Sequence, residues 1–460
     1  MRMTKILVTI GPSSEVMHIL YRMIKEGADG VRINFAHGNV ESRIKYVKTV
    51  REIEKKLEIH IPIIGDIQGP TFRLGDIEEF KVKRDDVIYL INASKGNAKE
   101  KLVPLPNTRL YDSIEEGDII LIEGGRLKFY VERLLEDKIQ CKVLNDGVIR
   151  SRKTVTIYGK EPDVVPITNK DIKDVEFSVK HGLDYLALSF VRRANDVKLL
   201  RDLLSEKGGE EIKIIAKIET KQAVRNLHEI IKVSDAILIA RGDLGMYFDL
   251  AEIPKIQEYI VRECIKYGKP VILATQILES MVSNPMPMRS EVVDAFNAVK
   301  QGVDALLLTS ETSIGSYPVE TVKWLRKIIE EGEKDLCLQV EGVNETIYDK
   351  FAKGVCLLAN SIGAKVIAYT RRGNTARRIS RYRIRNPTIV VTNSEKVARQ
   401  INILWGIRPL YVEASDYNEA WFKAFEKLKS KGIIAYGDIV ILTTGLREGA
   451  TDLVKIEIVR

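Results

Sequence analysis

Short apolar runs alternate with amphipathic segments along most of the chain. Eight of the runs have the length and β-branched content of buried parallel strands, at residues 6–10, 30–35, 61–67, 185–190, 212–218, 236–240, 271–275 and 305–309. Helical patterns follow nearly all of them, for example at residues 40–57, 252–267, 291–299 and 318–329. Eight such units close a parallel barrel, whereas an open doubly wound sheet usually has fewer strands and a glycine-rich first turn. The pattern therefore predicts an α/β fold built on a (β/α)8 TIM barrel.

The pattern changes between residues 70 and 159. Runs at residues 87–91 and 118–122 are short and apolar, and residues 138–143 alternate polar with apolar side chains. Turn signals such as Glu116-Gly117 and Asp146-Gly147 separate the runs. We expect a small β-barrel domain inserted after the third strand, where it can act as a lid over the end of the barrel that carries chemistry.

A third region follows the barrel. A helical pattern near residues 346–361 precedes new strand-like runs, which lie at residues 366–370, 389–392, 410–412 and 439–442. This alternation predicts a C-terminal α/β domain with an open sheet. The predicted domains are residues 1–69 and 160–335 for the barrel, 70–159 for the lid and 336–460 for the C-terminal domain.

Charge and composition narrow the class of protein. The 460 residues include 72 basic and 64 acidic side chains, giving a net charge of +8. The basic residues are interleaved with acidic ones and form no long arm, so we expect small phosphorylated anions rather than nucleic acid as partners. No apolar run approaches the roughly 20 residues of a membrane span, and the first strand begins without a signal-peptide pattern, so we expect a cytoplasmic protein that binds no membrane.

The four cysteines carry little information about function. Cys141, Cys264, Cys337 and Cys356 are scattered without paired spacing. This spacing argues against both a disulfide framework and a zinc site.

Two strand ends concentrate charge. Lys217 and Glu219 close one apolar run, and Arg241 and Asp243 close the next. The carboxyl ends of barrel strands are where α/β barrels place chemistry. Two carboxylates that share a barrel mouth with two cations are suited to holding a divalent metal against an anionic substrate. A structural ring of salt bridges is the alternative reading, because ion-pair networks also gather at strand ends.

Together with six further motifs, these two strand ends, in this order and spacing, make the chain resemble the pyruvate kinase family over essentially its whole length. They lie at residues 9–14, 31–38, 66–70, 189–192, 216–220, 240–245, 274–281 and 311–318. The resemblance implies a barrel interrupted by a β lid and followed by a regulatory domain. It also implies transfer of the phosphoryl group of phosphoenolpyruvate to ADP, giving pyruvate and ATP in the final step of glycolysis.

The resemblance assigns roles to individual residues. Glu219 and Asp243 resemble the ligands of Mg²⁺ or Mn²⁺, and Lys217 resembles the residue beside the phosphoryl in flight. The residues similar to those that contact the substrate are Ser189, Arg241, Gly242, Asp243 and Thr275, with Thr275 and Thr309 on the path of the proton. Arg32 resembles a catalytic arginine that faces the phosphate and also contacts the nucleotide. The residues similar to the family's other nucleotide contacts are Asn34, His37, Arg73 and Lys153.

Several substitutions depart from the family pattern. The monovalent cation site would use Asn34, Asp66 and the carbonyl of Ile67, but Ala36 lacks the usual serine hydroxyl. Thr71 replaces a glutamate that often accompanies potassium use. We therefore predict weak or no dependence on potassium.

The C-terminal domain carries a predicted anion site. Residues Thr370, Arg371, Arg372, Gly373, Asn374 and Thr375 follow a predicted strand and open a helix, whose free amides favour anions. In the family this loop holds a phosphate of a regulatory ligand, and a second loop with Arg447 closes over it. We expect a small phosphorylated effector acting through a homotetramer; a solvated basic loop is the alternative.

Two other functions stay open on the sequence. A metal-dependent barrel lyase acting on oxo acids could use the same acid pair, but it needs neither lid nor nucleotide pocket. A non-catalytic sensor of phosphorylated metabolites could keep the regulatory domain alone. Pyruvate formation from phosphoenolpyruvate, with and without ADP and Mg²⁺, separates the three.

Overall fold

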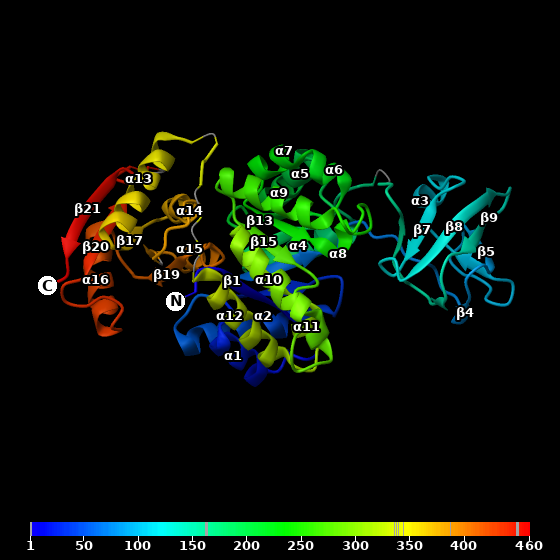
Figure 1. Cartoon of the computed structure of the whole chain (residues 1–460), viewed down its shortest axis with the longest axis horizontal. Coiled ribbons are helices and arrows are strands. Elements are labelled where there is room, and N and C mark those ends of the chain that lie inside the picture. The colour runs from blue at the N-terminus through cyan, green and yellow to red at the C-terminus, as the bar shows by residue number, and fades with distance from the viewer. Residues whose placement is uncertain are drawn as a thin grey trace.

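A computed structural model gives the fold in three bodies, with the barrel between the inserted β domain and the C-terminal domain (Figure 1). The described residues are 2–161, 164–334, 336, 338, 340–343, 345–386, 388–447 and 450–460. Two residues named in the sequence analysis lie outside these ranges. They are Asp335, the predicted last residue of the barrel domain, and Cys337, the third cysteine along the chain. In the described part of the chain, no helix is long and apolar enough to cross a membrane.

Eight parallel strands form a closed barrel in the order β1-β16-β15-β14-β13-β12-β3-β2. They are β1 (Lys5–Ile10), β2 (Gly30–Asn34), β3 (Ile63–Ile67), β12 (Tyr185–Leu188), β13 (Lys213–Ile218), β14 (Ala236–Ala240), β15 (Val271–Ala274) and β16 (Ala305–Leu308). Nearly every side chain of these strands is buried, because the barrel interior takes one face and the outer helices cover the other. The predicted barrel and its eight strands are confirmed.

Helices surround the barrel. The longer ones are α1 (Met17–Glu26), α2 (Val40–Leu57), α4 (Asn169–Lys180), α5 (Ala194–Glu206), α7 (Leu227–Val233), α9 (Ile253–Lys266), α10 (Arg289–Gln301) and α12 (Pro318–Glu333). Short segments follow four strand ends and shape the barrel mouth: α6 (Lys221–Arg225), α8 (Arg241–Leu244), the 3₁₀ helix at Glu279–Val282 and α11 (Ser310–Ser313).

The inserted domain is all-β apart from α3 (Thr108–Asp112). Its strands are β4 (Phe80–Val82), β5 (Val87–Ile91), β6 (Leu102–Pro104), β7 (Ile119–Ile122), β8 (Leu127–Leu134), β9 (Ile139–Val143), β10 (Gly147–Ile149) and β11 (Val155–Ile157). A six-stranded sheet in the order β11-β7-β8-β9-β5-β6 and the pair β10-β4 share one apolar core. Alternating burial along β9 explains the period-two pattern of residues 138–143.

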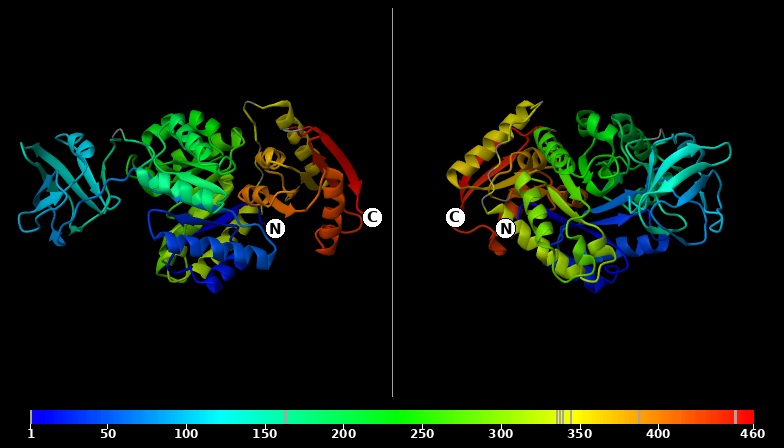
Figure 2. Two further views of the ribbon diagram at one scale, coloured as in Figure 1. Left: turned by 180° about the vertical axis from the view of Figure 1, so that it is seen from behind. Right: turned by 45° about the vertical axis from the view of Figure 1, so that its right-hand side comes forward.

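The C-terminal domain is an open sheet in the order β19-β18-β17-β20-β21. Its elements are α13 (Ile347–Ile362), β17 (Lys365–Tyr369), α14 (Asn374–Arg381), β18 (Thr388–Thr392), α15 (Glu395–Ile401), β19 (Ile407–Tyr411), α16 (Tyr417–Ser430), β20 (Ile439–Thr444) and β21 (Leu453–Ile458). Figure 2 shows this domain against one end of the barrel and the β domain beyond the other. The antiparallel edge strand β21 was not expected from the sequence.

Candidate active site

A cavity of about 510 Å³ lies at the carboxyl ends of the barrel strands, between the barrel and the β domain. The barrel contributes charged and polar side chains that include Arg32, Asp66, Lys217, Glu219, Asp243 and Thr275. The β domain contributes Arg73, Glu123 and Thr156 to the opposite wall. The structure therefore brings the predicted catalytic residues together in one cavity.

Lys217 is the centre of the charge cluster. Its Nζ lies 2.9 Å from Glu219 Oε1 and 3.3 Å from Asp66 Oδ1, and it donates to Ser189 Oγ at 2.8 Å. Its side chain is only 12% exposed. Burial alone would lower the pKa of Lys217, but the surrounding carboxylates outweigh burial and place this pKa above its ordinary value. Lys217 is therefore held as a cation that faces the cavity.

Arg32 forms the second cationic group of the barrel mouth. Its Nε lies 2.7 Å from Asp66 Oδ2, and its Nη1 donates to Thr9 Oγ1 at 3.1 Å. Burial raises the pKa of Asp66, but the charges of Lys217 and Arg32 outweigh it and hold this pKa below its ordinary value. Asp66 thus orients both cations as a permanent carboxylate.

Glu219 and Asp243 form an acid pair in which Glu219 is buried and Asp243 is partly buried. Glu219 is 1% exposed, and its Oε2 accepts a 2.7 Å hydrogen bond from the Phe190 N–H. Burial and the neighbouring Glu219 raise the pKa of Asp243, against the opposing effect of Lys217. Two neighbouring carboxylates, one of them buried, are stabilised by an added positive charge, which a divalent cation or a shared proton can supply.

The Arg241 side chain differs from its predicted place between the carboxylates. Its Nη1 lies 2.6 Å from Asp294, and its Nη2 donates to the carbonyls of Thr275 and Gln276 at 2.9 and 2.6 Å. The cause is that α8 begins at Arg241 and turns this side chain towards α10. Arg241 fixes the loop after β15, and the residues that follow it, Gly242 and Asp243, line the cavity in its place.

That loop carries strained backbone. Thr275 and Gln276 have φ angles of +69° and +53°, in the left-handed region that residues other than glycine rarely adopt. Gly242 N–H donates to Thr275 Oγ1 at 2.9 Å, so the threonine hydroxyl is held beside the loop that carries Asp243. Thr309 lines the same cavity, and its hydroxyl donates to Glu311 Oε2 at 3.2 Å.

The predicted nucleotide residues separate into two groups. Arg32, Asn34 and Arg73 line the cavity. Among the described residues that line the cavity, His37 and Lys153 are absent. His37 is exposed on the loop after β2, and Lys153 Nζ forms an ion pair with Glu123 at 2.6 Å. These two therefore lie at the rim.

Lys170 is a rim residue that the sequence analysis did not single out. It lies in the first turn of α4, and its Nζ donates to the Phe35 carbonyl at 2.9 Å and to the Gln68 side chain. Partial burial and the charges of Arg73, Arg32 and Lys170 lower the pKa of His37. The signal that could have found Lys170 is its position at a helix start directly after the inserted domain.

The β domain touches the barrel beside the acid pair. Leu121 of β7 packs with Met246 and Tyr247, which follow α8, and Thr156 Oγ1 lies 3.6 Å from Met246 Sδ. Glu161, where the chain returns to the barrel, accepts from the N–H groups that open α6. The position of the β domain is thus linked by direct packing to the segment that carries Asp243.

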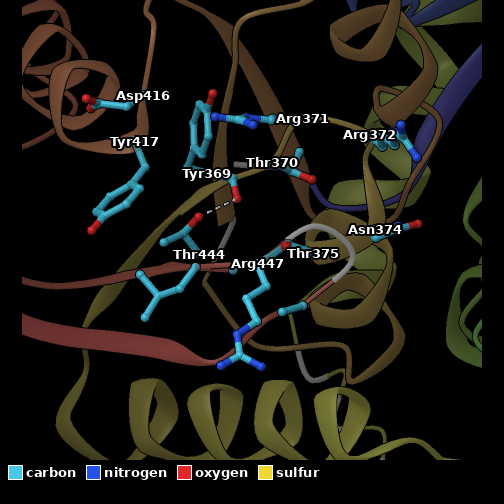
Figure 3. Close-up of a pocket in the computed structure, with 13 residues that line it drawn as sticks. Tyr369, Thr370, Arg371, Arg372, Asn374, Thr375, Asp416, Tyr417, Thr444 and Arg447 are labelled. Atoms are coloured by element: carbon cyan, nitrogen blue, oxygen red, sulfur yellow. Dashed lines mark hydrogen bonds between the residues drawn. The ribbon is translucent and has the colours of Figure 1, made fainter.

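The predicted effector loop lines a separate cavity of about 370 Å³ in the C-terminal domain (Figure 3). The predicted residues in its wall are Thr370, Arg371, Arg372, Asn374, Thr375 and Arg447. The wall also includes Tyr369, Asp416 and Tyr417, which the sequence analysis did not name. The Tyr369 hydroxyl is buried and, among the described residues, has no hydrogen-bond partner. Arg372 points away from Arg371 and Arg447. Glu448 and Gly449 of the second predicted loop lie outside the described residues.

A closed α/β barrel whose mouth joins an acid pair, a lysine and an arginine beneath a β domain defines a class of enzymes that act on anionic substrates. The comparisons narrow this class. Residues 1–322 match the family described as "Pyruvate kinase, barrel domain", and residues 349–457 match "Pyruvate kinase, alpha/beta domain".

Individual relatives agree over the full length. A pyruvate kinase of Aeropyrum pernix is 37% identical in sequence, over 95% of this chain and 94% of that protein. A pyruvate kinase of Staphylococcus epidermidis is 35% identical, over 100% of this chain and 81% of that protein. The crystal structure of pyruvate kinase from Pyrobaculum aerophilum superimposes with a TM-score of 0.89 at 33% identity, covering 100% of this chain and 99% of that one. The crystal structure of a pyruvate kinase from Cryptosporidium parvum superimposes with a TM-score of 0.92 at 32% sequence identity. That match covers 100% of this chain and 96% of the other. The chain belongs to the pyruvate kinase family, whose known activity is the glycolytic transfer of a phosphoryl group from phosphoenolpyruvate to ADP.

Proposed function

We propose that this chain performs the phosphoryl transfer of its family at the cavity between barrel and β domain, with Lys217, Glu219 and Asp243 at its centre. The observation that carries the proposal is the contact of the buried Lys217 ammonium with Glu219, Asp66 and Ser189 on one cavity wall. A fixed cation at that point stabilises charge that develops on the transferring phosphoryl and on the enolate left behind.

Glu219 and Asp243 fit a divalent cation such as Mg²⁺ or Mn²⁺, because they are hard oxygen donors held side by side, with Glu219 buried and Asp243 partly buried. No group of three or more His, Cys, Asp or Glu side chains within the described ranges is arranged to hold a metal. Substrate and water oxygens would therefore complete the coordination. When bound, the metal supplies positive charge against the substrate's carboxylate and phosphoryl oxygens.

The remaining side chains bind and orient the substrates. Arg32 and Arg73 present planar forks that match phosphoryl oxygens. The backbone at Gly242 and the Ser189 hydroxyl would contact the substrate carboxylate. Asn34, with the rim residues His37, Lys153 and Lys170, would contact ADP.

Formation of pyruvate needs a proton on the enolate carbon. Thr275 presents its hydroxyl on the cavity wall, where Gly242 N–H already donates to it, so the hydroxyl hydrogen is free to point into the cavity. Thr309 lies on the wall of the same cavity, and its hydroxyl donates to the buried carboxylate of Glu311. We assign proton delivery to these groups.

The predicted potassium ligands are already engaged. Asp66 contacts Arg32 and Lys217, the Ile67 carbonyl accepts from Ser189 Oγ at 2.8 Å, and Asn34 Oδ1 accepts from Ala36 N–H at 3.0 Å. This arrangement supports activity without a bound monovalent cation.

The test is pyruvate formation from phosphoenolpyruvate, measured with and without ADP and Mg²⁺. We expect pyruvate and ATP to form in equal amounts, and to form only when ADP and Mg²⁺ are both present. Pyruvate formed without ADP would indicate a lyase or phosphatase, and no turnover with any divalent metal would indicate a sensor.

We also propose that a small phosphorylated effector binds the C-terminal cavity and acts through a homotetramer. Arg371, Arg447, the Thr370 and Thr375 hydroxyls and the buried Tyr369 hydroxyl support an anionic ligand there. The measurement is the phosphoenolpyruvate saturation curve in the presence of sugar phosphates, phosphoglycerates and nucleotides. A shift that survives Arg371→Ala with Arg447→Ala would place the effector elsewhere.

A further inference from the structure

We propose that a second cavity, between the barrel and the C-terminal domain, binds a small phosphate-bearing anion. This cavity of about 300 Å³ lies at the amino ends of the barrel strands, opposite the active site. The barrel side is formed by Tyr185, Lys213, Asp235 and Pro270, which begin or directly precede four neighbouring strands. The proposal does not depend on the roles assigned above.

The other wall comes from the C-terminal domain. It consists of residues 372–374 and Arg377 at the start of α14, with Gln400, Ile401 and Leu404 at and after the end of α15. The Tyr185 hydroxyl donates to the Gln400 carbonyl at 2.6 Å, and Gln400 Nε2 donates to the Glu211 carbonyl at 2.7 Å. These hydrogen bonds join the two walls directly, so the cavity is preformed.

The charge of this cavity is unbalanced. Among the ion pairs of the residues that the structure describes, none includes Lys213 or Arg377, and the hydrogen bond of Arg377 goes to the neutral Asn374 side chain at 2.7 Å. At the same domain interface Arg383 is paired with Asp304 at 2.6 Å. Two half-buried cations without carboxylate partners therefore face one cavity, which favours an anion between them.

Asp235 does not supply the missing charge. Its Oδ2 accepts from Arg201 Nη2 at 2.9 Å and from the Ile214 N–H at 2.9 Å. Its carboxylate is thus paired directly with Arg201, whereas the charge of Lys213 acts on it without a direct ion pair. Lys269, next to Pro270, lies in the wall of a neighbouring cavity, and burial and then the charge of Arg377 lower its pKa to about 8.

The start of α14 adds backbone donors. This eight-residue helix begins after its N-cap residue Gly373, which has a φ of +83°. No side chain at the N-cap makes a hydrogen bond to the first turn. The N–H groups of the first turn have no partner within the helix, and because Asn374 lines both this cavity and the effector cavity, they favour a phosphate at either position. Cations from both domains and these amides together make a site for a compact, multiply charged anion.

The cavity is distinct from the effector cavity and can be tested separately. Arg372 and Asn374 belong to both walls, whereas Lys213 and Arg377 belong only to this one, and Arg371 and Arg447 only to the other. A ligand here would bridge the barrel and the loop that opens α14. Its binding is therefore expected to stabilise the contact between the two domains.

The test uses crystals of the full chain, grown without phosphate and soaked in millimolar selenate, an anomalous scatterer that mimics phosphate. We expect an anomalous peak within hydrogen-bond distance of Lys213 Nζ and the Arg377 guanidinium. The peak should be lost in the double variant Lys213→Gln with Arg377→Gln and kept in the matched control Arg371→Gln with Arg447→Gln. No peak at this position, or a peak that persists in the first double variant, overturns the proposal.

Solution binding distinguishes free phosphate from a phosphorylated metabolite. Orthophosphate, sugar phosphates, phosphoglycerates and nucleotides are titrated into the protein without divalent metal, and the melting temperature is followed. The double variant should weaken the effect of the best ligand by at least about tenfold. If that variant does not fold, Lys213→Met alone is used, and an unchanged titration with it would contradict the site.

Discussion

The Gly242 N–H lies 2.9 Å from Thr275 Oγ1, so the loop that carries Asp243, a proposed metal ligand, also holds the hydroxyl proposed to deliver the proton. Thr275 adopts a left-handed backbone, and Arg241 holds its carbonyl from the other side. Two groups that follow β14, the Gly242 N–H and the Arg241 guanidinium, thus hold the hydroxyl and the carbonyl of Thr275 at the end of the neighbouring strand β15. Binding and protonation of the substrate are therefore connected through the contact between Gly242 and Thr275.

Replacement of Thr275 by valine tests this connection. Thr275→Val removes the hydroxyl, so proton delivery should slow by at least about a hundredfold, the usual size of a lost acid-base contact. The measurement is exchange of pyruvate methyl protons with deuterated water, followed by NMR. Thr275→Ser keeps the hydroxyl and should retain most of the exchange; equal loss in both variants would mean that the loop, rather than the hydroxyl, matters.

Removal of one charge from the acid pair should change metal binding. Glu219→Gln keeps the size of the side chain but removes a charged oxygen donor, so a higher concentration of Mg²⁺ should be needed for half-maximal activity. Binding of Mn²⁺, measured by electron paramagnetic resonance, provides a readout that does not depend on turnover. Glu258→Gln, on the exposed face of α9, is the matched control. Unchanged Mn²⁺ affinity would remove Glu219 from the site.

Potassium should activate weakly or not at all. The oxygens of Asp66, Ile67 and Asn34 already have partners, and Ala36 provides no side-chain oxygen. Activity is measured in a buffer whose only monovalent cation is a bulky organic one, and potassium is then added. Activation by much more than about tenfold, or ~1.4 kcal/mol of barrier, would contradict this prediction.

Glu54 should stabilise the contact between barrel and C-terminal domain in a pH-dependent way. Its Oε1 lies 2.7 Å from Arg399 Nε of α15, and its Oε2 lies 2.9 Å from Arg51 Nη1. Burial opposes ionisation, but a hydrogen bond with His60 and the charges of Arg51 and Arg399 outweigh burial and lower the pKa of Glu54 to about 2.

A lowered carboxyl pKa contributes stability above the ordinary value of 4.5, and the contribution is lost as the pH falls towards about 2. Glu54→Gln should therefore lower the melting temperature by a few degrees near neutral pH, and the difference from the unmodified protein should shrink near pH 3. Glu52→Gln, on the exposed face of α2, is the control. A difference that does not depend on pH would point to packing instead of charge.

The barrel strands could be predicted because their apolar runs are buried on both faces. Strand β21 could not, since only its two intermediate positions are partly covered and its other side chains are exposed on an antiparallel edge. The residue types at the strand ends indicated Lys217, Glu219 and Asp243 correctly as neighbours on one cavity. The direction of the Arg241 side chain depends on Asp294, more than fifty residues later, and no local pattern contains that contact.

The C-terminal cavity shows the same limit. The loop at residues 370–375 was visible as a strand followed by a helix start, but Tyr369, Asp416 and Tyr417 join its wall only through the fold. The interdomain cavity was not predictable at all, because Lys213 and Arg377 come from different domains.

The most direct test of the account is the turnover of Lys217→Met. Methionine keeps most of the stem volume and removes the charge, so folding and phosphoenolpyruvate binding should survive. Turnover should fall by at least about two to three orders of magnitude, the size expected for one preorganised electrostatic group. The exposed Lys198→Met on α5 is the matched control and should be unaffected. A folded Lys217→Met protein that forms pyruvate and ATP at a near-normal rate would contradict the account.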